Sequence, residues 1–152
     1  MFYAVLLALA VVLFDQVSKL YIEAHMSVGS SVPVVNNVFH ITLVLNPGAA
    51  FGILEHQQWF FIVVALLLFA AVAFFYRRLA LLSQTLRLGV ALFVGGALGN
   101  LIDRIRLGCV VDFFDFRIWP VFNVADTAIV LGVGLIGWGM LQLSEAKKDE
   151  VR

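Results

Sequence analysis

Long apolar segments separated by polar stretches are the main feature of the hydrophobic pattern of this chain. A helix of about 20 apolar residues is long enough to cross the hydrocarbon core of a bilayer. Four such segments are present, at about residues 2–21, 59–76, 86–102 and 124–143. The pattern therefore predicts four transmembrane helices with two outer loops, at residues 22–58 and 103–123.

The third apolar segment is rich in glycine, and its Gly95 and Gly99 are four residues apart. Small residues at this spacing lie on one face of a helix and allow a neighbouring helix to approach closely. We therefore expect the third helix to lie at the centre of the helical bundle.

The first outer loop contains a pattern with a different period. In residues 39–45, the apolar residues Phe39, Ile41, Leu43 and Leu45 alternate with His40, Thr42 and Val44. This period of two is typical of a half-buried strand. Residues 32–35 can pair with this strand across Asn36 and Asn37, a dipeptide that favours turns. The loop is therefore expected to form a small sheet that lies on the membrane.

A break in the pattern at residues 46–48 follows this hairpin, and residues 48–54 then form an apolar piece that is too short to span a bilayer. Glycines within such a segment suit a hinged lid at the interface. The expected fold class is an all-α polytopic membrane protein with four transmembrane helices, a small extracytoplasmic β-element and a short interfacial lid segment.

The composition agrees with a membrane location. Hydrophobic residues make up 62% of the chain and charged residues 13%, whereas charged residues make up about 25% of a typical soluble domain. Four spans and their loops use up the chain, so residues 1–152 are expected to form a single membrane domain. The formal net charge is zero and there is no basic block, so no nucleic-acid partner is expected.

The distribution of basic residues predicts the orientation in the membrane. With four spans, both termini and the loop between the second and third spans lie on one side, and this side carries six Lys and Arg residues. The opposite loops carry three, at Arg104, Arg106 and Arg117. By the positive-inside rule, both termini are expected to be cytoplasmic.

Two aspartates occur in strongly apolar surroundings, Asp112 in the second outer loop and Asp126 at the start of the fourth apolar segment. Ionisable groups at membrane depth are costly and usually mark a functional site. Two nearby carboxylates cannot both ionise freely, so one of them keeps a proton, and such a pair can activate water. The pair suggests an intramembrane aspartic hydrolase.

Other polar residues also fall at the outer ends of the predicted spans. Asp15 and Lys19 are four apart and share a helical face, as do Asn100 and Arg104. Taken singly, such residues have structural explanations, for example an ion pair, a turn or a helix-end cap at Asp103. Because they all lie on the outer side, they can converge on one site, where amide groups could orient a carboxylate.

No cofactor or metal is expected. Cys109 is the only cysteine, which excludes an intrachain disulfide and a multi-cysteine metal site. The three histidines, His25, His40 and His56, do not have the spacing of a metal-binding motif.

The sequence resembles the lipoprotein signal peptidases (signal peptidase II), which are aspartic proteases of the bacterial inner membrane. Five stretches carry the resemblance, in the order of the family: 15–19 (DQVSK), 46–52 (NPGAAFG), 95–104 (GGALGNLIDR), 108–113 (GCVVDF) and 122–127 (FNVADT). Together they extend from the first predicted span to the fourth, and five linked blocks are a specific signal.

The resemblance implies a function for individual residues. The catalytic dyad of the family corresponds to Asp112 and Asp126. The resemblance and the placement on the outer side together suggest further residues that bind substrate or support the site. These are Asp15, Lys19, Asn46, Gly48, Asn100, Asp103, Arg104 and Asn123.

The resemblance also implies partners and a location. The expected substrate is a prolipoprotein that carries a diacylglyceryl group on a cysteine, and cleavage occurs just before that cysteine. A globomycin-type cyclic peptide is the expected inhibitor. The protein is expected to be a multi-pass monomer in the lipid of the bacterial cytoplasmic membrane, with its active site near the extracytoplasmic face.

Other classes of function remain as alternatives. A small proton- or ion-coupled transporter could use Asp15, Lys19, Asp103 and Asp126 as a relay, but a relay needs charged residues through the depth of the bilayer, and the second span has none. A noncatalytic assembly subunit would also suit the glycine-rich spans. A serine or cysteine peptidase would need a histidine beside its nucleophile.

Overall fold

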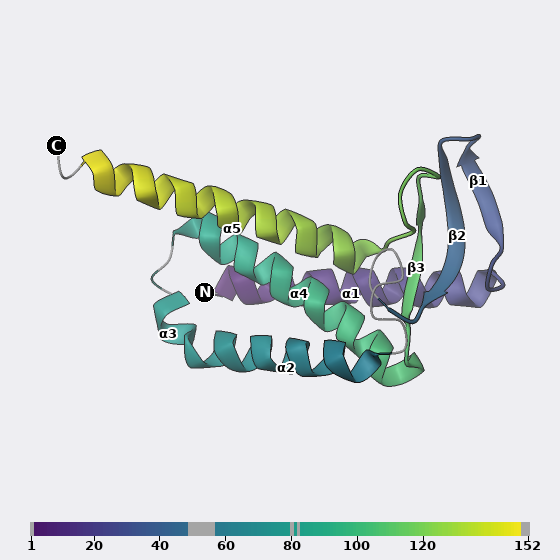
Figure 1. Cartoon of the computed structure of the whole chain (residues 1–152), viewed down its shortest axis with the longest axis horizontal. Helices are drawn as coiled ribbons and strands as arrows, with labels where there is room; N and C mark the ends of the chain where they lie inside the picture. The colour runs from purple at the N-terminus through teal and green to yellow at the C-terminus, as the bar shows by residue number, and fades with distance from the viewer. Residues whose placement is uncertain (1, 49–56, 80, 82, 150–152) are drawn as a thin grey trace.

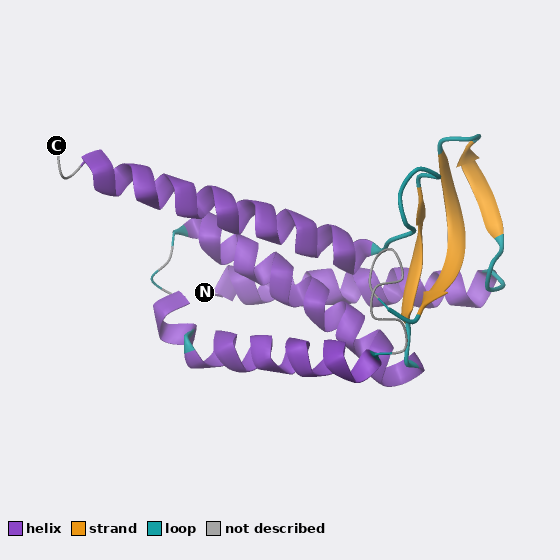
Figure 2. Ribbon diagram, viewed as in Figure 1, coloured by secondary structure: helices purple, strands orange, loops and turns teal. Residues whose placement is uncertain are grey.

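Four long helices and a small sheet make up the structure, a computed structural model that describes residues 2–48, 57–79, 81 and 83–149 (Figures 1 and 2). The helices are α1 (Phe2–His25), α2 (Gln58–Phe74), α3 (Tyr76–Leu79), α4 (Gln84–Leu107) and α5 (Val124–Asp149). The strands are β1 (Ser31–Val35), β2 (Phe39–Asn46) and β3 (Val110–Asp115). The predicted lid, residues 48–54, lies outside the described residues except for Gly48.

Within the described residues, three helices are long and apolar enough to cross a membrane: Phe2–His25, Gln84–Leu107 and Val124–Ser144. These helices correspond to the first, third and fourth predicted spans. The second predicted span, residues 59–76, is interrupted at Phe75, so that α2 has 17 residues and the four-residue α3 follows it. The prediction of a membrane-embedded helical fold is therefore confirmed for three spans, but the count of four is not.

Helix α4 lies at the centre of the bundle, as its glycines predicted, and packs against α1, α2 and α5. The contact with α5 is especially close. A Cβ atom placed on Gly89 would lie 2.9 Å from the carbonyl oxygen of Gly132, and one placed on Gly132 would lie 2.7 Å from that of Gly89. Only glycine allows the two backbones to approach this far.

We expect Gly96→Ala to destabilise the bundle, by about 1–3 kcal/mol, since overpacking costs roughly this much. An added methyl group at Gly96 would collide with the carbonyl oxygen of Ala125 and the side chain of Ile129, on the turn of α5 that carries Asp126. Thermal unfolding in detergent measures the effect. Gly134→Ala is the matched control, because no atom lies within 4 Å of a Cβ placed there; an equal loss of stability in both variants would contradict the packing argument.

The predicted hairpin is present in the sheet, whose strand order is β1-β2-β3 with both pairs antiparallel. Ser31 pairs with Thr42 and Pro33 with His40, and the turn contains Asn37 at a φ of 60°. Asparagine tolerates this left-handed conformation better than most residues, which explains the turn.

Residues 103–123, predicted as the second outer loop, contain two elements of regular structure that the sequence pattern did not indicate. Helix α4 continues to Leu107 and ends at Gly108, whose φ of 74° suits glycine. Residues 110–115 then form β3, which pairs with β2. Five of the six residues of β3 are buried, so the strand lacks the alternation of buried and exposed residues that would have revealed it.

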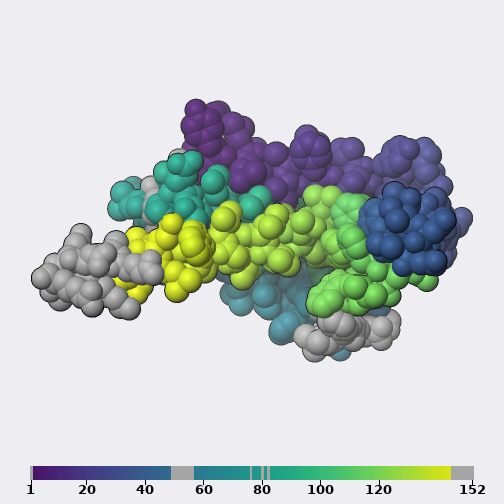
Figure 3. All heavy atoms as spheres, turned by 90° about the horizontal axis from the view of Figure 1, so that it is seen from above, coloured from purple at the N-terminus to yellow at the C-terminus, as the bar shows by residue number. Residues whose placement is uncertain are grey.

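The sheet caps one end of the helical bundle, and both chain termini lie toward the other end (Figure 1). Seen from above, the atoms of the first two strands form a rounded lobe at that end of the molecule (Figure 3). Strand β3 connects the sheet to the bundle, because it follows α4 directly and Val111 bonds to the side chain of α4 residue Asp103. The site described next lies at this junction.

Candidate active site

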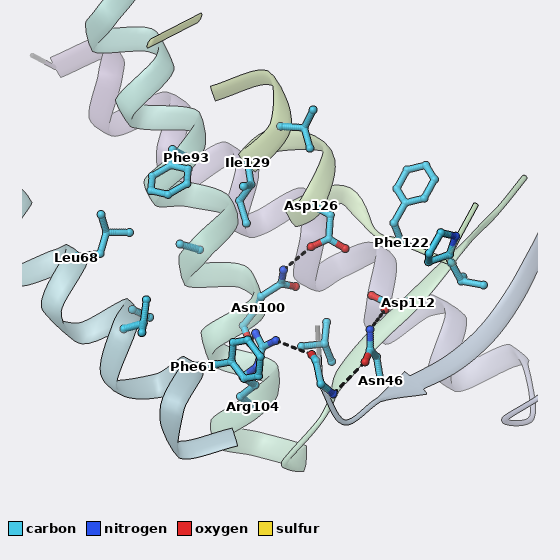
Figure 4. Close-up of a pocket in the computed structure, with 18 of the residues that line it drawn as sticks. Asn46, Phe61, Leu68, Phe93, Asn100, Arg104, Asp112, Phe122, Asp126 and Ile129 are labelled. Carbon is cyan, nitrogen blue, oxygen red and sulfur yellow. Dashed lines mark hydrogen bonds between the residues drawn. The ribbon is translucent and has the colours of Figure 1, made fainter. Parts of the chain in front are cut away.

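A cavity of about 430 Å³ lies between α2, α4, α5 and the sheet, and the two candidate catalytic aspartates line it (Figure 4). Its polar lining comes from Asn46, Gly48, Asn100, Arg104, Asp112 and Asp126. The rest of the wall is mainly apolar and includes Phe61, Leu68, Phe93 and Ile129. The cavity therefore has one polar end, next to the sheet, and an apolar body between the helices.

Asp126 is held by the start of α5. Its carboxylate oxygen Oδ2 accepts a hydrogen bond from the backbone N–H of Asn123 at 3.2 Å, and its own backbone N–H donates to Oδ1 of Asn123 at 2.8 Å. This reciprocal pair is a capping box, formed between the residue before the helix and the third residue of the helix. The positive end of the helix dipole also favours an anion at this position.

Asp112 comes from the middle of β3 and is only 2% exposed. Its Oδ1 accepts a hydrogen bond from Nδ2 of Asn123 at 2.6 Å, and its Oδ2 accepts one from Nδ2 of Asn46 at 2.9 Å. Burial, followed by the charge of Asp126, raises the pKa of Asp112 to about 7, and the two amide hydrogen bonds offset part of this rise.

Within the described residues, all hydrogen bonds to the carboxylate oxygens of Asp112 and Asp126 come from N–H donors. Nδ2 of Asn100 donates to Oδ1 of Asp126 at 2.7 Å, so each of the four oxygens accepts one N–H bond. Asn123 bonds to both carboxylates and so sets their relative position. A proton on either carboxyl group has no acceptor in this surrounding shell and must point toward the other carboxylate or into the cavity.

The orientation of Asn46 follows from its own backbone turn. Oδ1 of Asn46 accepts a hydrogen bond from the backbone N–H of Gly48 at 3.0 Å, which leaves Nδ2 as the group that faces Asp112 (Figure 4). Asn46 is the last residue of β2, the strand that pairs with β3. The sheet therefore brings Asn46 and Asp112 together although they are 66 residues apart in sequence.

Behind the dyad lies a fully buried charged cluster of Asp15, Lys19 and Asp103. Nζ of Lys19 is 2.8 Å from a carboxylate oxygen of Asp15 and 2.8 Å from one of Asp103, and it donates to Oδ1 of Asn100 at 3.0 Å. The ammonium group has three hydrogens and three acceptors, so it is fully satisfied. The prediction that Asp15 and Lys19 share a buried face of the first helix is confirmed.

This cluster also positions the backbone beside each member of the dyad. The carboxylate of Asp15 accepts the N–H of Ala125 at 2.9 Å, and that of Asp103 accepts the N–H of Val111 at 3.1 Å. Ala125 immediately precedes Asp126, and Val111 immediately precedes Asp112. Asp103 is thus an internal ion-pair partner of Lys19 and not the helix-end cap that was its alternative structural explanation.

Sequence reasoning missed Gln16, which connects the same cluster. Nε2 of Gln16 lies within hydrogen-bonding distance of Asp15, Asp103 and the carbonyl oxygen of Gly99, at 3.0–3.1 Å. Gln16 lies in the first of the five motif blocks, which was the available signal. Gly99 allows this contact, because a Cβ there would collide with the carboxylate of Asp15.

Arg104 lines the cavity and has three contacts, one of which is a long hydrogen bond of 3.5 Å from Nη1 to the carbonyl oxygen of Asn100. Its guanidinium lies 4.4 Å from the ring centroid of Phe61, in a cation–π arrangement, and Nη2 donates to the carbonyl oxygen of Gly48 at 3.1 Å. Phe61 was also missed by sequence reasoning, because every residue of α2 after Gln58 is apolar and none of them stands out.

All ten residues proposed from the sequence lie in this one assembly of cavity, dyad and buried cluster. Their individual roles stay predictions. Within the described part of the chain, no group of three or more His, Cys, Asp or Glu residues has the geometry of a metal site. Three of the four charged residues considered for a transport relay, Asp15, Lys19 and Asp103, form a cluster in which Lys19 is satisfied locally. The fourth, Asp126, lines the cavity.

Comparisons with known proteins identify the family. Residues 7–142 match the family model described as signal peptidase (SPase) II. The chain is 45% identical over 152 residues to a lipoprotein signal peptidase of Pelotomaculum thermopropionicum, covering 100% of this chain and 99% of the relative. It is 50% identical over 136 residues to one of Moorella thermoacetica, covering 90% of this chain and 91% of the relative.

A solved structure described as a bacterial membrane enzyme has the same fold, with a TM-score of 0.90 and 36% sequence identity, and the match covers 97% of this chain and 92% of that one. A second one gives a TM-score of 0.84 and 37% identity, with 93% and 94% covered. The sequence match and the structural match both extend over nearly the whole chain. This chain therefore belongs to the signal peptidase II family.

Proposed function

We propose that this signal peptidase II removes the signal peptide from diacylglyceryl-modified prolipoproteins, cleaving before the lipid-bearing cysteine, with Asp112 and Asp126 as the catalytic residues. The observation that carries the proposal is the donor-only surrounding of the dyad, in which each carboxylate oxygen accepts one N–H bond. This arrangement leaves two directions for the proton of the dyad, toward the other carboxylate or into the cavity, where a scissile carbonyl would lie.

The reaction needs no covalent bond between the enzyme and the substrate. The ionised carboxylate takes a proton from a water molecule as its oxygen attacks the scissile carbonyl, and the protonated carboxyl polarises that carbonyl. The tetrahedral intermediate then collapses, the C–N bond breaks, and the leaving amine receives a proton from the dyad. Both carboxylates must face one point in space, and Asn123 supports this by bonding to each of them.

The shape of the cavity suits a substrate with a peptide part and a lipid part. Polar groups of the cavity lie at the end next to the sheet, and apolar side chains of α2, α4 and α5 line the remainder. None of the residues of α2 is buried, so this helix packs lightly against the others. An acyl chain and an apolar signal peptide could therefore remain in contact with lipid while the scissile bond reaches the dyad.

We propose that α2 is a fourth membrane span and that residues 1–152 form one membrane peptidase domain. Seventeen residues of helix extend about 25 Å, slightly less than the hydrocarbon core of about 30 Å. The helix carries no charged residue, and α3, with Arg77 and Arg78, follows it at the end remote from the sheet (Figure 1). A bilayer can adapt to such a small mismatch by local thinning.

The proposed orientation places both termini in the cytoplasm and the sheet at the extracytoplasmic face. Arg77 and Arg78 lie on α3, at the end of α2 remote from the sheet, where the positive-inside rule expects basic residues (Figure 1). Tyr21 and Trp59 are exposed near the sheet end of α1 and α2, as expected for an aromatic belt at an interface. The proposed form is a monomer.

The test is cleavage of a diacylglyceryl-modified prolipoprotein by the purified protein in detergent, followed by mass spectrometry. We expect release of the signal peptide just before the lipid-bearing cysteine, and inhibition by globomycin. The same precursor without its diacylglyceryl group is the control and is expected to react at least about tenfold more slowly, because the contacts of the lipid part are lost. Equal cleavage of both precursors would overturn the proposed substrate class.

A further inference from the structure

The geometry points to Lys19 as a positioning residue that acts through Asn100 to keep Asp126 as the ionised member of the dyad and to leave the proton on Asp112. The inference deepens the proposed function and rests on it. It assigns different tasks to two aspartates that the reaction requires but does not by itself distinguish.

Lys19 determines which way the amide of Asn100 points. An ammonium group only donates hydrogen bonds, so the group of Asn100 that faces Nζ of Lys19 at 3.0 Å must be the oxygen. The same oxygen accepts a second bond from Nδ2 of Asn123 at 3.1 Å. The nitrogen of Asn100 therefore faces Asp126 and donates to its Oδ1 at 2.7 Å.

The charge of Lys19 also strengthens this bond. A cation bound to the oxygen of an amide polarises the amide, and its N–H groups become better donors. The side chain of Lys19 is completely buried, so water does not screen its charge. The donor that Asn100 offers to Asp126 is thus a charge-assisted one, and it favours the carboxylate over the carboxylic acid.

Asp126 and Asp112 differ in their remaining donors. Asp126 also accepts the backbone N–H of Asn123 in the capping box at the positive end of α5. Asp112 lies in a buried strand without a helix N-terminus, and its donors are the side-chain amides of Asn46 and Asn123. The environment of Asp126 therefore stabilises an anion more strongly than that of Asp112.

The charged groups around Asp126 come from three elements. They are Asp112 on β3, Asp15 and Lys19 on α1, and Asp103 and Arg104 on α4. Lys19 bonds to Asp15 and to Asp103, and the other hydrogen bonds to these two carboxylates come from donors as well. The negative charge of Asp15 opposes ionisation of Asp126, whereas Lys19 favours it through its own charge and through Asn100.

The assignment gives each aspartate a defined step. Asp126 takes the proton from water while the water oxygen bonds to the scissile carbon, and Asp112 polarises the carbonyl oxygen. Asp112 then donates its proton to the amine nitrogen as the C–N bond breaks. Transfer of the proton from Asp126 back to Asp112 restores the starting state, so protons balance over one turnover.

Infrared difference spectroscopy can locate the proton without any substrate. At pH 5, we expect the C=O stretch of a buried protonated carboxyl in the wild type and in Asp126→Asn, and its loss in Asp112→Asn. The opposite pattern, with the band lost in Asp126→Asn and kept in Asp112→Asn, would overturn the assignment. Because this experiment measures no cleavage, its outcome is independent of the proposed substrate.

The role of Lys19 is tested by the pH profile of kcat/KM for the wild type and two variants. Lys19→Met alone would leave two buried carboxylates unpaired, so the double variant Lys19→Met/Asp103→Asn is used. This variant keeps the formal charge of the Asp15, Lys19 and Asp103 cluster at −1. The acid limb of the kcat/KM profile reports ionisation of Asp126. In the double variant, we expect this limb to move to higher pH by about one unit. Asp103→Asn alone retains Lys19 and is expected to leave the acid limb in place or move it down.

An unmoved acid limb in the double variant, or an equal upward shift in Asp103→Asn, would overturn the role of Lys19. Asn100→Ala provides a second variant in case the double variant does not fold. It removes the connection to Asp126 while Lys19 keeps both of its carboxylate partners. The same upward shift is expected, and an unchanged limb in Asn100→Ala would contradict the inference.

Discussion

Replacement of Asp126 or Asp112 by asparagine is expected to lower kcat/KM for prolipoprotein cleavage by at least about 10³-fold, since general acid–base catalysis by one positioned group contributes roughly 10²–10⁴-fold and the dyad acts as a unit. An amide can neither accept the proton of the attacking water nor donate one to the leaving amine. The measurement is the initial rate of signal-peptide release, followed by mass spectrometry.

Asp115→Asn is the matched control for these variants. Asp115 is also a buried acid of β3, three residues from Asp112, but it does not line the cavity, and it bonds to Thr42 and Arg117. Its replacement is expected to change the rate less than about threefold, as befits a residue outside the reaction. Appreciable cleavage by both dyad variants, each folded as judged by circular dichroism, would exclude the proposed dyad.

The rate of cleavage is expected to fall as the pH rises above about 7. Burial and the charge of Asp126 raise the pKa of Asp112 to about 7, so Asp112 keeps its proton below this pH and loses it above. If the protonated Asp112 is the acid, kcat/KM decreases about tenfold for each pH unit well above the pKa, and roughly 50-fold between pH 7 and pH 9. A rate that is flat up to pH 9 would contradict this.

Asn46→Ala tests whether the pKa of Asp112 sets the alkaline limb of the pH profile. Asn46 donates a hydrogen bond to Oδ2 of Asp112, which favours the anion and lowers the pKa of Asp112. Loss of this donor makes the protonated form more favourable, so the alkaline limb of the kcat/KM profile should move to higher pH, whatever happens to the maximum rate. A shift to lower pH would show that Asn46 does not act on Asp112 in this way.

The helical membrane architecture and much of the candidate site could be predicted from the sequence alone. The apolar segments around α1, α4 and α5 are long and uniform, so the hydrophobic requirement of the bilayer leaves few alternatives. The hairpin of β1 and β2 was predictable because one period-two pattern and one turn dipeptide are local signals. The candidate site residues could be grouped because each is polar in an apolar setting, where polar groups are costly.

Which of these residues contact one another could not be predicted, because the contacts depend on how distant segments pack. Strand β3 is buried on both faces, and its pairing with β2 is a contact between distant segments that no local pattern encodes. Gln16 looked like an ordinary polar neighbour of Asp15, and Phe61 like any other residue of an apolar helix, until the packing of three helices gave each a partner.

The direction of every hydrogen bond around the dyad was likewise a tertiary property. A sequence shows that Asn100 and Asn123 carry amides, but it does not show which end of each amide faces a carboxylate. That choice follows from donors and acceptors on other elements, namely Nζ of Lys19 on α1 and the backbone N–H of Asp126 on α5. Residue types follow from the local cost of burial, whereas their protonation and orientation depend on long-range contacts that form only when the chain is folded.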